Sequence, residues 1–273
     1  MNQFIFIDGQ VLQPNGQIQQ LNLLFKSGLL VGKGYLPDED ESSLKTYPIS
    51  GQLVLPKLLA LSDLGLISLD CLLDPQLNHL KQQVAKPIYG IVIDLLTHTP
   101  DDIKACVSRL TYLNLPIVLS CFDRLYDRLF IQSMLDCLKQ ANQYVCMYVS
   151  DLDLQYSVIS DLKRMYPGLQ CAIDSTQFPM ISSSVLPVAF DCVDMVFSSD
   201  DLSQSLQQMV VRCDTVSVNF DQLCLKLSWN GLRFFKYKPF GFTLGEPISM
   251  VVLSSDRSKI DYQVEQGCLI RSV

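Results

Sequence analysis

The sequence predicts an α/β fold, in which a parallel sheet covered by helices is accompanied by a smaller satellite sheet. Two observations predict it. Residues 56–239 alternate apolar runs of strand length with amphipathic helical stretches, which is the pattern of βα units. Residues 1–55 and 240–273 hold short strands separated by turn residues. Because β-rich segments at both ends surround an α/β middle, we expect the two ends to meet in one sheet.

The first 55 residues read as strands and tight turns. The run from Phe4 to Ile7 is followed by Asp8-Gly9, a dipeptide typical of a hairpin. Pro14-Asn15-Gly16 marks a second turn and Ser27-Gly28 a third. We therefore expect a small antiparallel sheet here.

From about residue 56 the pattern becomes strand, loop, helix. Six buried-looking strands recur at intervals of 24 to 30 residues, and they begin near Leu58, Ile88, Ile117, Tyr144, Leu169 and Val193. Each interval fits one βα unit. An alternative remains that Thr215–Phe220 or Phe178–Leu186 supply further strands.

The intervening helices carry their own signals. Thr99-Pro100-Asp101-Asp102 supplies an N-cap, a proline at the first helical position and early negative charge. Apolar residues at helical spacing then mark one buried face, beginning at Ile103, and the same pattern recurs after Leu154 and Leu202. After these helices, residues 248–253, 260–264 and 269–270 return to strand and turn.

Composition narrows the functional classes. The chain has 273 residues, 21 basic and 28 acidic, which gives a net charge of −7. A pI of about 4.8 argues against nucleic acid as a partner. We find no secretory signal and no apolar run of membrane-spanning length. The ten cysteines, none in C-x-x-C spacing, are then expected to be reduced thiols in a cytoplasmic protein.

Both ends of the chain carry short motifs that match those of a known protein family. The segment from Ile7 to Gly16 and the segment Gly51–Pro56 resemble, in that order, an opening N-G-x-V-x-D-P-x-G and a G-x-x-V-x-P approach to a first barrel strand. Both motifs are those of the dihydroorotase branch of the amidohydrolase superfamily, which the chain therefore resembles. Leu227–Arg233 resembles the L-S-x-N-P-A-R segment, with Gly231 where proline is usual. The resemblance implies a (β/α) TIM-like barrel, here shortened or incomplete, in residues 56–239. It also implies a composite β-sandwich from residues 1–55 plus 240–273.

The departures from this family concern its metal ligands. Members follow the proline with G-x-I-D-x-H-x-H, and here Ser62 and Leu64 stand where the two histidines belong. The family binds zinc, but leucine cannot coordinate it and neutral serine is a poor replacement for imidazole. We therefore expect no cofactor. Asp200 resembles the family's final aspartate ligand, although a shift of one residue would put Ser199 there instead.

Other residues are candidates for a residual pocket. His98 follows a strand, on the side where barrel enzymes place their sites, and is otherwise a solvated loop residue ahead of a helix cap. Asp94, Asp174 and Asp200 follow strands in the same way and could approach one another, or they could cap helices. We expect no catalytic residue among them.

These features favour a pseudoenzyme. Inactive homologues in the family are structural subunits, so the resemblance implies an assembly role in pyrimidine biosynthesis, with aspartate carbamoyltransferase or an active dihydroorotase as the partner. A homo-oligomer is another way to cover the strand edges of an open barrel. The alternatives are a residual metal-dependent hydrolase of cyclic amides that uses Asp200, and a small-molecule sensor that uses the old active-site mouth.

Overall fold

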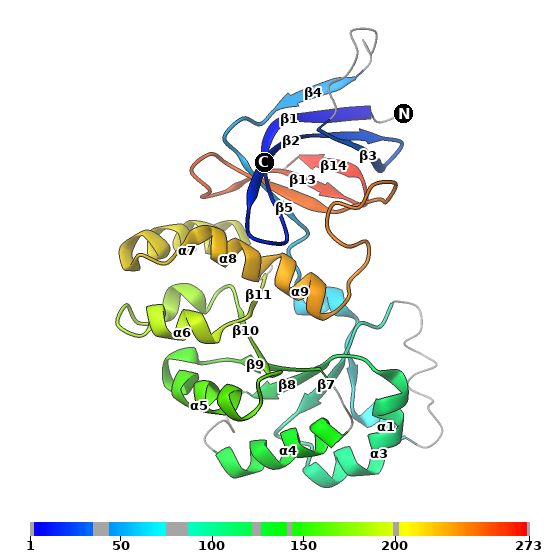
Figure 1. Ribbon diagram of the computed structural model, residues 1–273, viewed down its shortest axis with the longest axis vertical. Helices are drawn as coiled ribbons and strands as arrows, with labels where there is room; N and C mark the ends of the chain where they lie inside the picture. Colours follow the sequence, from blue (N-terminus) through cyan, green and yellow to red (C-terminus); the bar gives the residue numbers. More distant parts are fainter. Residues whose placement is uncertain are drawn as a thin grey trace. The chain divides into compact units, whose positions relative to one another are not determined.

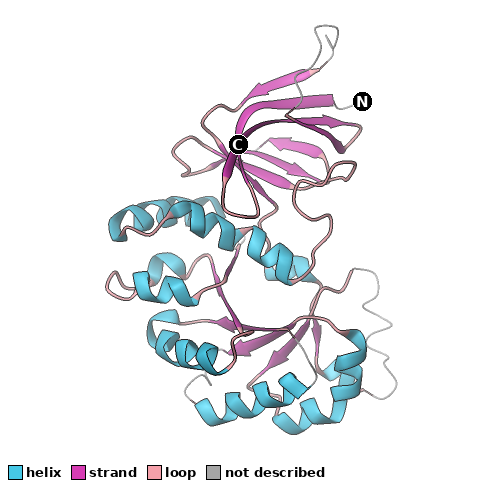
Figure 2. Cartoon of the chain, viewed as in Figure 1, coloured by secondary structure: helices cyan, strands magenta, loops and turns pink. Residues whose placement is uncertain are grey.

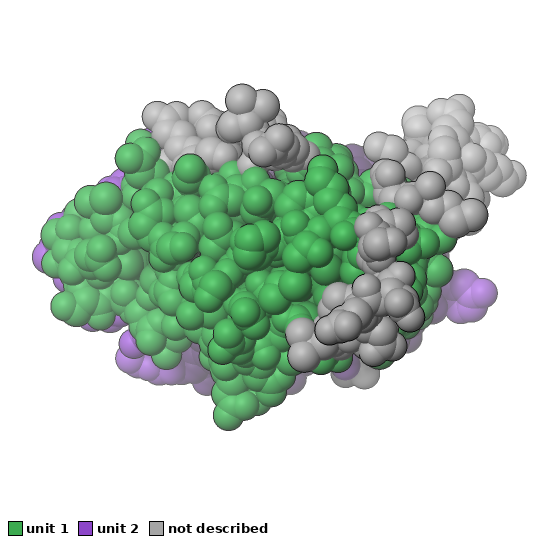
Figure 3. All heavy atoms as spheres, turned by 90° about the horizontal axis from the view of Figure 1, so that it is seen from above, with its two compact units in different colours: residues 1–59, 199–233, 237–273 green, residues 60–198, 234–236 purple. Residues whose placement is uncertain are grey.

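The computed structural model describes residues 3–34, 44–74, 87–121, 127–140, 144–198 and 202–271. The chain divides into two compact units, which Figure 3 colours separately. Unit 1 contains residues 1–59, 199–233 and 237–273, and unit 2 contains residues 60–198 and 234–236. In this division, segment 199–233 groups with the two ends of the chain.

Unit 2 is built on a six-stranded sheet whose neighbouring strands are all parallel (Figure 2). The spatial order is β11-β10-β9-β8-β7-β6. The strands are β6 (Ile67–Ser68), β7 (Ile91–Asp94), β8 (Ile117–Cys121), β9 (Val145–Val149), β10 (Gln170–Asp174) and β11 (Met195–Phe197). The spatial order of the strands follows their order in the sequence, so each strand lies beside the next one along the chain. The predicted α/β fold with a parallel sheet is confirmed.

Helices connect these strands on the outer side of the sheet (Figure 1). They are α1 (Asp70–Leu73), α3 (Pro100–Leu113), α4 (Arg128–Gln140), α5 (Leu152–Met165), η2 (Phe178–Met180) and α6 (Leu186–Cys192), while η1 (Leu61–Leu64) precedes the first strand, β6. Helix α3 begins as predicted. The Thr99 hydroxyl accepts a hydrogen bond from the Asp102 amide, and the Asp102 carboxylate accepts one from the Thr99 amide at 2.8 Å. This reciprocal pair satisfies two amides that the first helical turn leaves free.

Unit 1 contains an eight-stranded sheet that combines both ends of the chain. Its order is β14-β13-β12-β5-β1-β2-β3, with β4 pairing β1. The strands are β1 (Gln3–Leu12), β2 (Ile18–Lys26), β3 (Leu29–Lys33), β4 (Lys45–Pro48), β5 (Leu53–Pro56), β12 (Met250–Leu253), β13 (Ile260–Glu265) and β14 (Cys268–Arg271). Strands β5 and β12 pair antiparallel. The expectation that the two ends meet in one sheet is therefore confirmed.

Within the described residues, unit 1 also contains α7 (Leu202–Val216), α8 (Phe220–Leu227) and all of α9 (Trp229–Phe234) except its last residue. The side chain of Asn219 caps α8 by accepting from the amides of Asp221 and Gln222. None of the helices within the described ranges combines the length and apolar character that a membrane crossing needs.

An aromatic cluster fills the core of the eight-stranded sheet. Phe4 and Phe25 stack with ring centroids 4.6 Å apart. The rings of Phe6 and Tyr47 each lie 5.5 Å from the ring of Tyr262, which comes from the C-terminal strand β13. Edge-to-face pairs at this spacing add stabilisation beyond the buried area. The cluster therefore joins strands from the two ends of the chain by side chains as well as by backbone pairing.

The predicted hairpin at Asp8-Gly9 is wrong. Strand β1 continues through it, and its register to β2 shifts between Phe6 and Gly9. Asp8 takes a positive φ of 61°, and its amide donates to Asn22 Oδ1 at 2.9 Å. A Cβ at Gly9 would lie 2.7 Å from Ile49 Cδ1. The dipeptide therefore forms a β-bulge under a close side-chain contact, and the hairpin turn comes later, at Pro14-Asn15-Gly16, as also predicted.

Two further strand predictions need correction. Leu58 is buried but lies outside any strand, and the first parallel strand is β6, nine residues later at Ile67. The apolar residues before Leu58 belong to β5, which pairs β12 in the other sheet. The alternative strands at 178–186 and 215–220 are also wrong, because those segments contain η2, the end of α7 and the start of α8.

Trp229, the first residue of α9, is held in unit 1 by a hydrogen bond and by ring packing. It is buried, and its indole Nε1 donates to the carbonyl oxygen of Leu12 at 2.9 Å. Its ring packs against Phe240 and Phe242, with centroids 5.3 and 6.0 Å away. Between these two residues Gly241 has a positive φ of 57°, and a Cβ there would overlap the Trp229 ring. Glycine is therefore required by both conformation and space.

Replacing Gly241 with alanine should destabilise the protein by about 2–4 kcal/mol, because a left-handed alanine and an overpacked core each contribute. Gly245→Ala is the matched control: Gly245 also has a positive φ, of 81°, but a Cβ there meets nothing within 4 Å. Urea unfolding followed by Trp229 fluorescence measures both variants. Equal losses in the two variants would contradict the packing role assigned to Gly241.

Candidate functional site at the carboxyl ends of the parallel strands

The register of the six-stranded sheet places polar side chains on one face near its carboxyl end. Asp94, Ser120 and Tyr148 are partners in adjacent strands. Register partners in a parallel sheet share a face, and residues one position earlier point to the opposite face. Ile93 and Met147, one position earlier, are fully buried on that opposite face. The carboxyl end is where folds of this type place their sites, so these groups define the candidate site.

Asp94 and Asp174 each bond within their own loop. Asp94 Oδ1 accepts from the Leu96 amide at 2.9 Å. Asp174 Oδ1 accepts from the amide and the hydroxyl of Thr176, at 2.9 and 2.7 Å. Two strands, β8 and β9, separate β7 from β10. The structure therefore does not bring the two carboxylates together, and each one stabilises the turn that follows its strand.

His98 is buried, with 4 % of its side chain exposed. Its Nδ1 lies 3.0 Å from the carbonyl oxygen of Asp94 and 3.1 Å from the hydroxyl of Thr97. Its Nε2 lies 3.2 Å from Asp70 Oδ1. Both ring nitrogens therefore have partners, so this is not the solvated loop residue that the sequence allowed. The imidazole ties the loop after β7 to the start of α1.

The partner of His98 escaped the sequence analysis. Asp70 follows β6, and its carboxylate also accepts from the Ser68 hydroxyl at 2.8 Å. That hydrogen bond, assisted by His98, holds the pKa of Asp70 below its ordinary value. The available signal was the spacing Ser68-Leu69-Asp70 after an apolar residue, which puts two polar side chains at the end of one strand.

Tyr148 is a second residue that the sequence did not single out. Burial raises the pKa of its phenol to about 12, and the negative charge of Asp174 adds to the effect. Its ring lies 6.0 Å from the ring of Phe197, which lies 6.1 Å from that of Phe235. The phenol therefore stays protonated at neutral pH, and its ring is part of an aromatic row beside the polar groups.

The residues matched to the family's histidine pair lie elsewhere. Ser62 and Leu64 are in η1, which precedes β6, so they stand toward the amino end of that strand. Ser62 is exposed and Leu64 is fully buried. The carboxyl end of β6 instead carries Ser68 and is followed by Asp70. Asp200 and Ser199 lie outside the described residues.

The described residues do not fit a zinc centre. Nowhere in the part of the chain that the structure describes do three His, Cys, Asp or Glu side chains gather in a way that could hold a metal ion. His98 Nε2 already contacts Asp70 Oδ1, and the Oδ1 atoms of Asp94 and Asp174 already accept backbone amides.

The fold is that of a TIM-barrel-related α/β protein, and solved structures share it. An L-hydantoinase (dihydropyrimidinase) from Arthrobacter aurescens matches with a TM-score of 0.68 and 11% identity, covering 100% of this chain and 96% of that one. A dihydropyrimidinase from Brevibacillus agri NCHU1002 matches with a TM-score of 0.66 and 8% identity, covering 98% and 95%. An N-acetyl-D-glucosamine-6-phosphate deacetylase from Mycobacterium smegmatis matches with a TM-score of 0.53 and 11% identity, covering 100% of both chains.

These neighbours belong to the amidohydrolase superfamily, and the hydantoinases among them are cyclic amide hydrolases. At such low identity the likeness establishes the fold of this chain and nothing finer. No protein-family model matches the sequence, and no curated protein matches it.

The Asp70 carboxylate should give the protein an acid-sensitive contribution to stability. Because the pKa of Asp70 is lowered on folding, its contribution is present above the ordinary aspartate pKa and disappears as the pH falls through the folded value. Asp70→Asn should therefore lower the free energy of unfolding at pH 7, by less than about 1 kcal/mol for so exposed a group. The difference in the free energy of unfolding between this variant and the unsubstituted protein, called the gap below, should disappear as the pH falls below about 4.

Urea titrations at pH 7, 5, 4 and 3 measure this gap. Ser68→Ala should reproduce most of the effect, because the Ser68 hydroxyl is the largest cause of the shift. Asp101→Asn, at an exposed aspartate that pairs with Lys104, is the charge-matched control. A gap for Asp70→Asn that is constant over the pH range would rule out the assigned contribution.

Proposed function

We propose that this chain is a non-catalytic dihydroorotase homologue that acts as a structural or assembly subunit in pyrimidine biosynthesis, with aspartate carbamoyltransferase as its partner. In this proposal unit 2 is a shortened (β/α) barrel and the terminal strands form a composite β-sandwich. The amidohydrolase-type fold supports the ancestry, and the order of motifs at both ends of the chain supports the dihydroorotase branch.

One observation carries the non-catalytic part: the imidazole of His98 is buried with both nitrogens engaged. A general base must offer a nitrogen to a water molecule or a substrate. Nδ1 of His98 instead faces the backbone of its own loop, and Nε2 faces Asp70. The polar groups at this end of the sheet hold loops in place, which is a structural task.

The residues at the end of the first strand of the six-stranded sheet also support a non-catalytic role. The family resemblance requires two histidines there, and the chain offers Ser68 and Asp70, whose side chains bond each other at 2.8 Å. Ser62 and Leu64, which match the two histidines in sequence, are not histidines either. Activation of water at neutral pH by zinc needs a ligand set that the described residues do not supply.

Native mass spectrometry of the tagged chain, purified gently from its own source, tests the assembly role. We expect co-purification with aspartate carbamoyltransferase at a fixed stoichiometry, because a scaffold subunit binds its partner in a defined ratio. An active dihydroorotase in the complex would identify the other partner of the proposal. Deletion of the chain provides the control, and a transferase that is fully assembled and active without it would contradict the assembly role.

A hydrolysis assay tests the non-catalytic part separately. With dihydroorotate as substrate, and with either equimolar Zn²⁺ or EDTA, we expect no rate above that of buffer. His98→Gln and Asp200→Asn should leave that result unchanged. Zinc-dependent turnover that disappears in Asp200→Asn would instead establish the residual hydrolase.

A further inference from the structure

A cavity of about 280 Å³ lies at the opposite end of the six-stranded sheet from the candidate site. Leu135 and Lys139 come from α4, and Met165 and Tyr166 come from the end of α5 and the turn after it. The other wall is formed where β9 and β10 begin, including Leu169. All of these elements belong to unit 2. Nothing in the proposed function uses this cavity.

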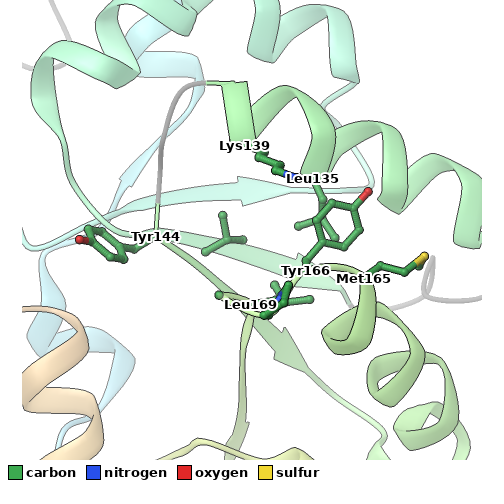
Figure 4. Close-up of a pocket in the computed structure, with 9 residues that line it drawn as sticks. Leu135, Lys139, Tyr144, Met165, Tyr166 and Leu169 are labelled. Carbon is green, nitrogen blue, oxygen red and sulfur yellow. The ribbon is translucent and has the colours of Figure 1, made fainter.

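The lining is mostly apolar, and the Lys139 side chain gives it one positive charge. Figure 4 shows Leu135, Tyr166 and Leu169 around a common space, with the side chain of Lys139 extending toward them from the last turn of α4. The Tyr144 ring points away from this space, and the Lys236 ammonium lies 5.5 Å from its centroid. Within the described ranges no carboxylate pairs with Lys139, so its charge is available to a ligand.

The Tyr166 ring is fixed before any ligand arrives. Its hydroxyl donates to Asp136 Oδ1 at 2.8 Å. Because the phenol proton is already engaged in the hydrogen bond to Asp136, Tyr166 offers an anionic ligand its ring and no hydroxyl donor. A rigid ring reduces the entropy that binding has to overcome.

The cavity is partly open to solvent, and its volume indicates the size of the group that fits inside it. A cavity of about 150 Å³ is enough to hold benzene. The present cavity is nearly twice as large and smaller than the ~300–1,000 Å³ of sites for drug-sized ligands. It therefore suits one aromatic ring with a small substituent, and Lys139 favours a substituent that is negatively charged.

From volume, lining and charge together, the geometry points to a binding site for a small aromatic carboxylate, with the ring among Leu135, Tyr166 and Leu169 and the carboxylate at the Lys139 ammonium. The site is separate from the carboxyl-end groups, so its existence does not depend on the proposed assembly role. No covalent step is involved.

A larger side chain at Gly168 is expected to fill the cavity. The glycine lines the space, its φ is not in the left-handed region, and a Cβ at this position meets nothing within 4 Å. Gly168→Leu should therefore fill the cavity without straining the backbone or displacing the core. A melting temperature equal to that of the unsubstituted protein would show that the fold is intact.

Benzoate is the probe, with benzamide as the neutral analogue and benzylamine as the cationic one. Isothermal titration calorimetry, supported by saturation-transfer NMR of the ligand, should give saturable benzoate binding with Kd on the order of 1 mM or tighter. Benzamide should bind about tenfold more weakly, because it lacks the charge-assisted bond to Lys139, and benzylamine more weakly still.

Two variants and one control complete the test. Gly168→Leu should abolish benzoate binding, and Lys139→Met should weaken it about tenfold, to the level of benzamide. Lys104→Met, which removes the same charge from exposed helix α3 of the same unit, should leave it unchanged. The proposal is overturned by no benzoate binding at 10 mM (about ten times the expected Kd), by binding that survives Gly168→Leu, or by equal binding of benzoate and benzylamine.

Discussion

The antiparallel pairing of β5 with β12 is the constraint on which the architecture depends. It joins Leu53–Pro56 to Met250–Leu253 over four residue pairs, and the amide of Lys57 extends it by donating to Ser249 at 2.9 Å. All of the chain between these strands is thereby closed into one long loop. The entropy cost of closure grows only slowly with loop length. A complete α/β unit and three more helices can therefore be accommodated between two strands of one small sheet.

The distance along the chain between interacting residues decides which parts of the fold were predictable from sequence. Periodicity and capping residues act locally, so the parallel strands after the first and the start of α3 at Thr99 could be predicted. Asp8-Gly9 could not, because its bulge depends on Asn22 and Ile49, which lie far from it in the sequence. The strand predicted at Leu58 was wrong for a related reason. Periodicity cannot distinguish a strand from a buried coil that follows a strand.

The position of the candidate site could be predicted from the sequence, but the hydrogen-bond partners of its side chains could not. A residue such as Asp94 or Asp174 that follows an apolar run must lie at the carboxyl end of a parallel strand, and both do. Whether such a carboxylate is free or bonded depends on a few ångströms of loop geometry. The Nε2 atom of His98 has a partner because Asp70 contacts it from the end of the neighbouring strand. That contact joins segments 28 residues apart and leaves no periodic trace in the sequence.

The hydrogen bonds at the carboxyl end of the sheet stabilise loops, but they also reduce the number of polar groups available for chemistry. Active sites keep polar groups available and accept a loss of stability for it. Here Asp70 and Asp102 have lowered pKa values because hydroxyl or amide donors of nearby residues stabilise their charged forms. Each such bond holds a loop more firmly and leaves less of the carboxylate for chemistry.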